Sequence, residues 1–189
     1  MKKIIYLILI CIIISCTNNS ETKLNEPKMN EKLVTAINLR KKEKFTESEI
    51  LMKELIIEEP KNAIFYYQYA WLCDNMEKEK DAYPKYEKAL ELGLSGEDLE
   101  RCYLGLGSTY RCIGEYQKSI EIFDKAISEF PNNNEFRVFK SMTLHNLNQH
   151  DEAMNILLNV VAKTSSDKGI MDYKKAIEYY SDKLNKKFD

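Results

Sequence analysis

The chain has 189 residues, of which 28 are Lys or Arg, 30 are Asp or Glu, and 44% are hydrophobic. This length is enough for one globular domain or one repeat array with a substantial core. A formal net charge of −2 provides no cationic surface for a nucleic-acid backbone, so the composition argues against DNA or RNA as a partner. With only six Gly and four Pro, an all-α fold is favoured over a sheet with many tight turns.

The N-terminal segment has the features of an export signal. Lys2 and Lys3 supply positive charge, and residues 4–14 form an unbroken apolar stretch. This stretch is about half as long as the roughly 20 residues of a membrane-spanning helix, so we expect no transmembrane anchor here. The sequence Ile-Ile-Ser-Cys at 13–16 resembles the bacterial lipobox, which implies cleavage before Cys16 and attachment of lipid, such as palmitate, to it. The alternative is an ordinary secretory signal with a coincidental cysteine.

Residues 16–28 are expected to tether the domain to this lipid, after removal of a signal peptide at 1–15. The tether is polar, has almost no apolar side chains and contains Pro27 near its end. Such a segment cannot bury enough surface to fold alone. In the bacterial lipoproteins that this segment resembles, an aspartate directly after the lipidated cysteine favours retention in the inner membrane. Thr17 occupies that position here. We therefore expect an exported, membrane-anchored, periplasm-facing lipoprotein, with the outer membrane favoured.

Small residues recur at two positions of a repeating unit. Successive units are separated by 34, 37 and 34 residues, and in each unit the two small residues are 12 apart. The pairs are Ala36 with Ser48, Ala70 with Ala82, Gly107 with Ser119, and Ser141 with Ala153. Small side chains at this spacing let two antiparallel helices approach closely. The sequence therefore predicts successive helical hairpins.

The unit at 100–133 resembles the tetratricopeptide repeat. Its matching residues have the spacing of the family signature: Tyr103, Leu106, Gly107, Tyr110, Gly114, Tyr116, Ser119, Phe123, Ala126 and Pro131. Less complete matches cover 29–62, 63–96 and 134–167, so four units fill residues 29–167. The resemblance implies a right-handed α-solenoid of about four hairpins.

The segment 168–189 is predicted to form a capping helix and tail at the open end of the solenoid. Its apolar residues alternate with charged ones in a pattern that we interpret as one amphipathic helix. These apolar residues are Met171, Ile177, Tyr180 and Leu184.

Capping residues predict where several helices start. A polar side chain stands three residues before an acid in three places, which predicts helix starts near 47, 96 and 133. These pairs are Thr46 with Glu49, Ser95 with Asp98, and Asn132 with Glu135. Pro84 lies six residues after an expected turn, so we expect its helix to start late, near Asp81, or to kink. Residues 97–99 are three extra residues between the second and third units, and they lengthen the separation of these units from 34 to 37 residues.

No residues form a catalytic or metal-binding pattern, so we expect no enzyme activity, cofactor or metal. His145 and His150 are the only two histidines, and five residues apart on a helix they point in different directions, so a zinc site would need other ligands. Cys73, Cys102 and Cys112 lack metal-ligand spacing. Buried free thiols are the favoured interpretation of these cysteines, and a disulfide from Cys73 to one of the others is the alternative.

By the same resemblance, the first helix of each repeat lines a concave surface that binds a partner. The residues at the ligand-facing positions of the last three units are Tyr67, Gln68, Trp71, Asp74, Arg101, Leu104, Ser108, Arg111, Phe139, Met142 and His145. Such side chains, including the only tryptophan, are enriched at binding hot spots. The alternative for each residue is packing against a neighbouring repeat.

Five of these residues are expected to form one continuous strip of aromatic and cationic character: Tyr67, Trp71, Arg101, Arg111 and Phe139. Such a strip suits an extended or helical segment with apolar anchors and at least one acidic residue. We therefore expect a non-enzymatic scaffold or adaptor in the bacterial cell envelope that binds a protein or peptide partner. The alternative is a dedicated binder of one partner, such as an immunity or inhibitor protein.

Overall fold

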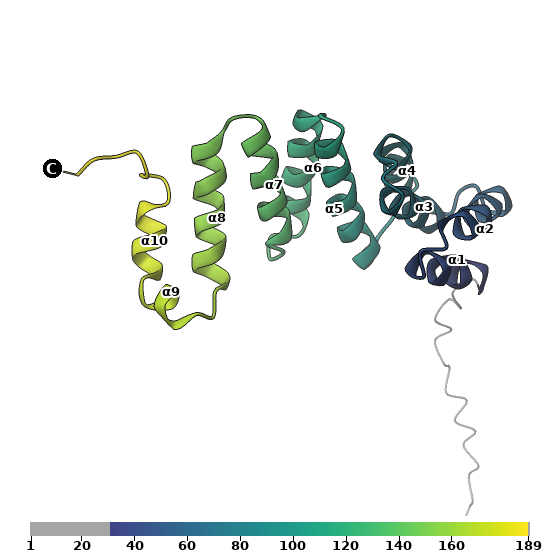
Figure 1. Ribbon diagram of the computed structural model, residues 1–189, viewed down its shortest axis with the longest axis horizontal. Helices are drawn as coiled ribbons and strands as arrows, with labels where there is room; N and C mark the ends of the chain where they lie inside the picture. The colour runs from purple at the N-terminus through teal and green to yellow at the C-terminus, as the bar shows by residue number, and fades with distance from the viewer. Residues whose placement is uncertain (1–30, 189) are drawn as a thin grey trace, which may run out of the picture.

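The computed structural model describes residues 31–188, which form ten helices and no strand. The helices follow one another in chain order along an elongated stack, and the first and last helices lie at opposite ends (Figure 1). The predicted all-α solenoid is confirmed. The predicted signal peptide and the predicted tether, with Cys16, lie outside the described residues. None of the helices between residues 31 and 188 combines the length and the apolar character needed to span a bilayer.

Eight of the helices form four antiparallel hairpins, one after another. Their bounds are α1 Glu31–Lys41 and α2 Phe45–Glu58, α3 Ala63–Asn75 and α4 Glu79–Glu91, α5 Gly96–Cys112 and α6 Tyr116–Glu129, and α7 Glu135–Asn146 and α8 His150–Thr164. The first helices of successive hairpins contact one another, α1 with α3, α3 with α5 and α5 with α7. Between residues 31 and 188, the second helices of successive hairpins make at most slight contact with one another. Closer approach on one side curves the stack, so the first helices form its inner face.

The small residues lie where the two helices of a hairpin cross. The Ser48 hydroxyl donates a hydrogen bond to the carbonyl of Ala36 at 2.8 Å, and the Ser119 hydroxyl donates one to the carbonyl of Gly107 at 2.7 Å. All four residues are buried. Each serine therefore serves two purposes, because it permits a close crossing and satisfies its own hydroxyl there. The predicted close approach at 12-residue spacing is confirmed.

A left-handed backbone residue in each hairpin turn sets the start of the second helix. Positive φ angles occur two positions before each second helix, at Glu43 (58°), Glu77 (56°), Gly114 (85°) and Asn148 (62°). Glycine adopts this conformation without strain, and the other three are held in it by the hairpin. Consequently α2 begins at Phe45 rather than near 47, and the expected cap residue Thr46 lies inside the helix.

The expectation of a late start at Pro84 is wrong for the same reason. Helix α4 begins at Glu79, two residues after the turn, as in the other hairpins. Pro84 is its sixth residue and cannot donate to the carbonyl of Lys80. Since both residues are exposed, water can donate a hydrogen bond to this carbonyl instead.

Of the other two predicted helix starts, one is confirmed and one is shifted. Helix α5 begins at Gly96, as predicted, and the excess residues 97–99 form its first turn. As a result α5 has 17 residues, against 13 in α3 and 12 in α7. Helix α7 begins at Glu135, two residues later than predicted, because the backbone N–H of Glu135 donates to the side chain of Asn133 rather than Asn132, at 2.8 Å.

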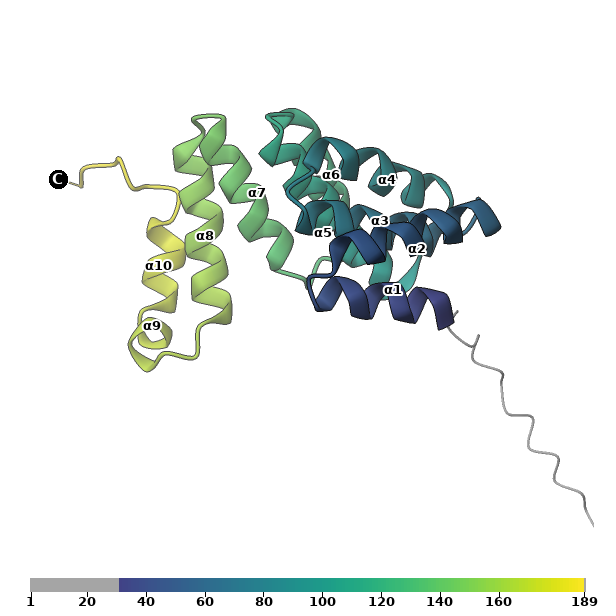
Figure 2. The same cartoon turned by 45° about the vertical axis from the view of Figure 1, so that its right-hand side comes forward.

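The C-terminal segment is not one helix over 169–187. It forms α9 (Lys168–Asp172) and α10 (Lys174–Tyr180), and α10 lies alongside α8 (Figures 1 and 2). Met171 and Leu184 are exposed, contrary to the amphipathic interpretation. For Met171 the spacing explains this result, since the six residues from Met171 to Ile177 turn a helix by about 600°, which leaves the two side chains on different faces. Leu184 lies beyond the end of α10.

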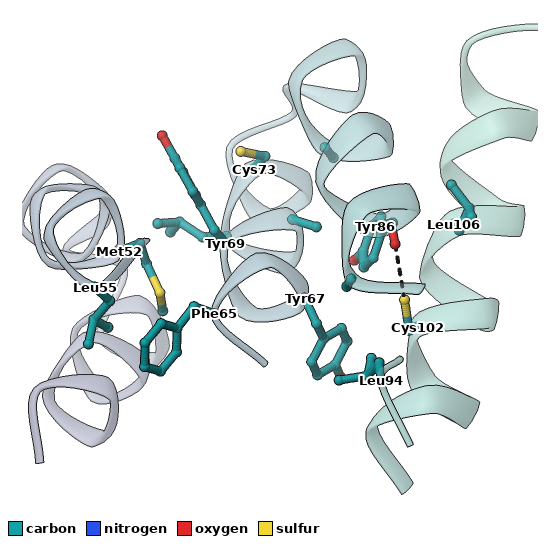
Figure 3. Packing of buried hydrophobic residues seen from close by; sticks show 14 of the residues in the cluster. Met52, Leu55, Phe65, Tyr67, Tyr69, Cys73, Tyr86, Leu94, Cys102 and Leu106 are labelled. Atoms are coloured by element: carbon teal, nitrogen blue, oxygen red, sulfur yellow. Dashed lines mark hydrogen bonds between the residues drawn. The ribbon is translucent and has the colours of Figure 1, made fainter. Parts of the chain in front are cut away.

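One buried hydrophobic cluster joins the first two hairpins to α5, and a second cluster joins α5, α6 and α7. Figure 3 shows Met52 and Leu55 of α2 facing Phe65 of α3, and Tyr86 of α4 beside Cys102 of α5. The Cys102 thiol approaches the carbonyl of Tyr86 at 3.8 Å.

The cysteines of residues 31–188 are free thiols. Cys73 and Cys102 are buried, and burial raises their pKa values to about 11 and about 12, so both remain protonated near neutral pH. Cys112 is exposed, which corrects the expectation that it is buried.

Candidate functional site

A cavity of about 800 Å³ opens on the inner face, where α3, α5 and α7 lie side by side. We call it the central groove. It brings together seven of the eleven predicted groove residues: Tyr67, Trp71, Asp74, Arg101, Leu104, Ser108 and Phe139. They come from three successive hairpins, so a segment bound here would contact all three at once.

The remaining predicted residues lie elsewhere. Gln68 is buried, with 7% of its surface exposed, and its backbone carbonyl accepts a hydrogen bond from Arg40 at 3.1 Å. Arg111, Met142 and His145 line a separate pocket between the ends of α5, α7 and α8. The expected continuous strip is therefore wrong at Arg111, which the C-terminal end of α5 carries out of the central groove.

The aromatic side of the groove is built around Trp71. Its ring lies 6.0 Å from that of Tyr67, centroid to centroid, and the Arg40 guanidinium stacks on it at 3.9 Å. Tyr67 is only 2% exposed and belongs to the core, so packing against its neighbours accounts for most of its surface. Trp71 is partly exposed and faces the groove. It is therefore the main aromatic side chain that a ligand could reach there.

Arg40 of α1 occupies a ligand-facing family position in the first repeat, and the structure shows it as a buried cation. It is 5% exposed, and among residues 31–188 no carboxylate lies within ion-pair distance of it. Burial lowers its pKa, but the Trp71 ring and the Gln68 carbonyl compensate part of the lost hydration. The result is that Arg40 holds the Trp71 ring in place.

The floor of the groove is a buried polar cluster. Asp74 accepts hydrogen bonds from the Tyr86 hydroxyl at 2.7 Å and from the Thr109 hydroxyl at 3.0 Å. Burial raises the pKa of Asp74, and these two bonds offset only part of that effect. A Cβ at Gly105 would lie 2.6 Å from the Tyr86 ring, so only glycine lets this tyrosine reach the aspartate. Asp74 is thus held by internal partners, although it lines the groove.

The charge of the groove differs from the expected cationic character. Four carboxylates line it, those of Asp74, Glu97, Glu100 and Glu135. Among the described residues of its lining, Arg101 is the single cationic side chain. Glu97 and Glu135 are exposed in the first turns of α5 and α7. The groove is therefore mainly acidic, and the expectation of a cationic strip is corrected.

The sequence contained one signal for these missed acids. The excess residues 97–99 add a turn to α5 and bring Glu97 to the rim of the groove. Glu100, one turn along, accepts a hydrogen bond from the Asn133 side chain at 2.7 Å. Family positions alone could not identify Glu97, because they omit the added turn.

The family model described as "Tetratrico peptide repeat" matches residues 61–184, more than half of the chain. The chain belongs to the tetratricopeptide repeat family. A curated relative, Superkiller protein 3 of Saccharomyces cerevisiae, is 29% identical over 91 residues, which are 48% of this chain and 6% of that protein. The chain thus spans a small part of that relative's length.

Solved tetratricopeptide repeat-like structures agree with the fold. The structure titled "Crystal structure of MamA" has a TM-score of 0.60 and 16% identity, and the match covers 77% of this chain and 91% of that chain. "MamA MSR-1 C2" has a TM-score of 0.58 and 16% identity, with 79% and 76% covered. Identities this low show the fold alone. Together with the family, the fold supports a protein-interaction scaffold, a kind of module that is typically non-enzymatic.

Proposed function

We propose that this tetratricopeptide repeat array holds a segment of one protein partner in the central groove and presents that partner at a membrane. One observation carries the proposal: three successive first helices jointly line a single cavity that offers a partly exposed tryptophan beside several carboxylates. Aromatic rings with large contact area make good anchors, and fixed charges at the rim select among segments.

The chemistry of the groove favours a partner segment with an apolar anchor and at least one Lys or Arg. Trp71 and Phe139 supply apolar contact, whereas Glu97 and Glu135 supply exposed negative charge. Because these carboxylates are exposed, their attraction for a basic segment is screened by salt. The sequence alone favoured an acidic segment, and the four lining carboxylates reverse that preference.

Photo-cross-linking tests where the partner binds without requiring its identity. A photoreactive amino acid in place of Leu104, inside the central groove, should cross-link the partner in intact cells. The matched control carries it in place of Glu121, an exposed residue on α6 of the same hairpin. We expect a cross-linked protein from position 104 and none from position 121. Cross-linking from position 121 alone would place the partner on the outer face instead.

The proposal also includes a lipid anchor at Cys16, in a periplasm-facing protein of the bacterial envelope, with the outer membrane favoured. The lipid anchor is supported by the two lysines at 2–3, the apolar stretch at 4–14 and the Ile-Ile-Ser-Cys sequence at 13–16. We expect Cys16→Ser to release the protein from membranes or to leave it unprocessed. Fractionation measures how much of the protein stays with membranes, and labelling with palmitate measures lipid attachment. Palmitate that still enters the Cys16→Ser variant would contradict the anchor.

A further inference from the structure

The two histidines of the chain lie against each other, although the sequence predicted that they point apart. Their Nδ1 atoms are 3.1 Å from each other, and their ring centroids are 4.7 Å apart. The prediction failed because the two residues are not on one helix. His145 lies in the last turn of α7 and His150 begins α8, and the left-handed turn at Asn148 reverses the chain between them.

Two methionines share a pocket with these histidines. Met142 precedes His145 by three residues on α7, and Met154 follows His150 by four residues on α8. Residues at these spacings lie on one face of a helix, one turn apart. All four side chains line a pocket of about 590 Å³ between α7 and α8. Met142 and Met154 are 41% and 43% exposed, so neither residue is buried in the core.

We propose that Met142, His145, His150 and Met154 form a binding site for a soft monovalent metal ion, Cu(I). Imidazole nitrogen together with thioether sulfur is a ligand set that selects Cu(I) over harder ions. With metal–nitrogen bonds of about 2.0 Å, two nitrogens 3.1 Å apart subtend an angle of about 100° at the metal, close to that of a tetrahedral site.

The surroundings of the pocket also select the ion. Among the described residues that line it there is no carboxylate, so Mg²⁺ and Ca²⁺ lack their preferred ligands. Arg111 lines the same pocket, and its positive charge opposes a divalent ion more strongly than a monovalent one. In the bound state both Nδ1 atoms are ligands, so each ring carries its hydrogen on Nε2, and the hydrogen between the rings moves there.

This site is independent of the proposed partner groove. The two cavities have no described lining residue in common, and the four ligands come from the last hairpin. Failure of either proposal therefore leaves the other untouched.

The test is an anaerobic titration of the full chain, in detergent, with Cu(I) in competition with a coloured Cu(I) chelator. Accessible thiolates also bind Cu(I), so Cys11, Cys16 and Cys112 are first replaced by serine. The thiols of Cys73 and Cys102 are kept, because both side chains are buried and closed to the ion. We expect one Cu(I) per chain, with NMR shifts at both histidine rings and at the methyl groups of Met142 and Met154.

Variants localise the site. His145→Asn should weaken Cu(I) binding by at least about tenfold, and so should Met142→Leu combined with Met154→Leu. The leucine changes conserve volume, and the helical content measured by circular dichroism should stay unchanged. The matched control is Met171→Leu, an exposed methionine of α9 outside the pocket, which should bind Cu(I) as before. Unchanged affinity in His145→Asn, equal loss in Met171→Leu, or tighter binding of Zn²⁺ than of Cu(I) would overturn the proposal.

Discussion

Replacing Gly107 with leucine should destabilise the whole array. A Cβ at Gly107 would lie 2.6 Å from the ring of Phe123, which is fully buried where α5 crosses α6. The Ser119 hydroxyl donates a hydrogen bond to the Gly107 carbonyl at the same crossing, which holds the two helices close together. Overpacking of this kind costs about 1 to 3 kcal/mol or more, and here a leucine must fit where a single methyl group already clashes. Melting followed by circular dichroism should show a lower midpoint.

A matched control separates this clash from the general effect of adding a leucine. Glu121→Leu places the same side chain on the exposed surface of α6, where the expected change in stability is within about 0.5 kcal/mol. A melting curve for Gly107→Leu that matches the wild type would mean that α5 and α6 do not cross at this residue. The repeat register would then be wrong.

The hairpins could be predicted because a close helix crossing requires small residues at a fixed spacing. Gly107 and Ser119 must be small for the backbones to approach, whatever surrounds them, so the 12-residue spacing is visible in the sequence alone. The helix starts could be predicted less well. They depend on left-handed turn residues, and only Gly114 and Asn148 among the four are residue types that favour such a backbone.

The groove could be predicted only in part, because its lining also depends on the packing of neighbouring hairpins. Family positions identify which side chains face inward on an ideal repeat, and Trp71 and Phe139 do so. They do not reveal that Arg40 of the preceding hairpin stacks on Trp71, or that the longer α5 moves Glu97 to the rim and Arg111 away. Those placements depend on how neighbouring hairpins pack, which one repeat does not encode.

Replacing Trp71 with alanine should weaken partner binding by about 2 kcal/mol, or roughly 30-fold in the dissociation constant. Trp71 is the partly exposed aromatic residue of the central groove, and its far face is fixed by Arg40, so little freedom is lost when a partner covers it. Some loss of thermal stability is expected as well, because the substitution uncovers the Arg40 guanidinium. Tyr173→Ala, a 69% exposed aromatic residue outside the groove, should leave affinity unchanged.

The most direct measurement is a calorimetric titration of wild-type, Trp71→Ala and Tyr173→Ala chains with the partner captured by cross-linking from position 104. Circular dichroism on the same samples gives the folded fraction of each. If the central groove binds the partner, the dissociation constant rises about 30-fold for Trp71→Ala alone while helical content at the titration temperature is unchanged. If Trp71→Ala instead lowers the melting temperature and the folded molecules bind as tightly as wild type, Trp71 belongs to the core and the central groove is not the binding site.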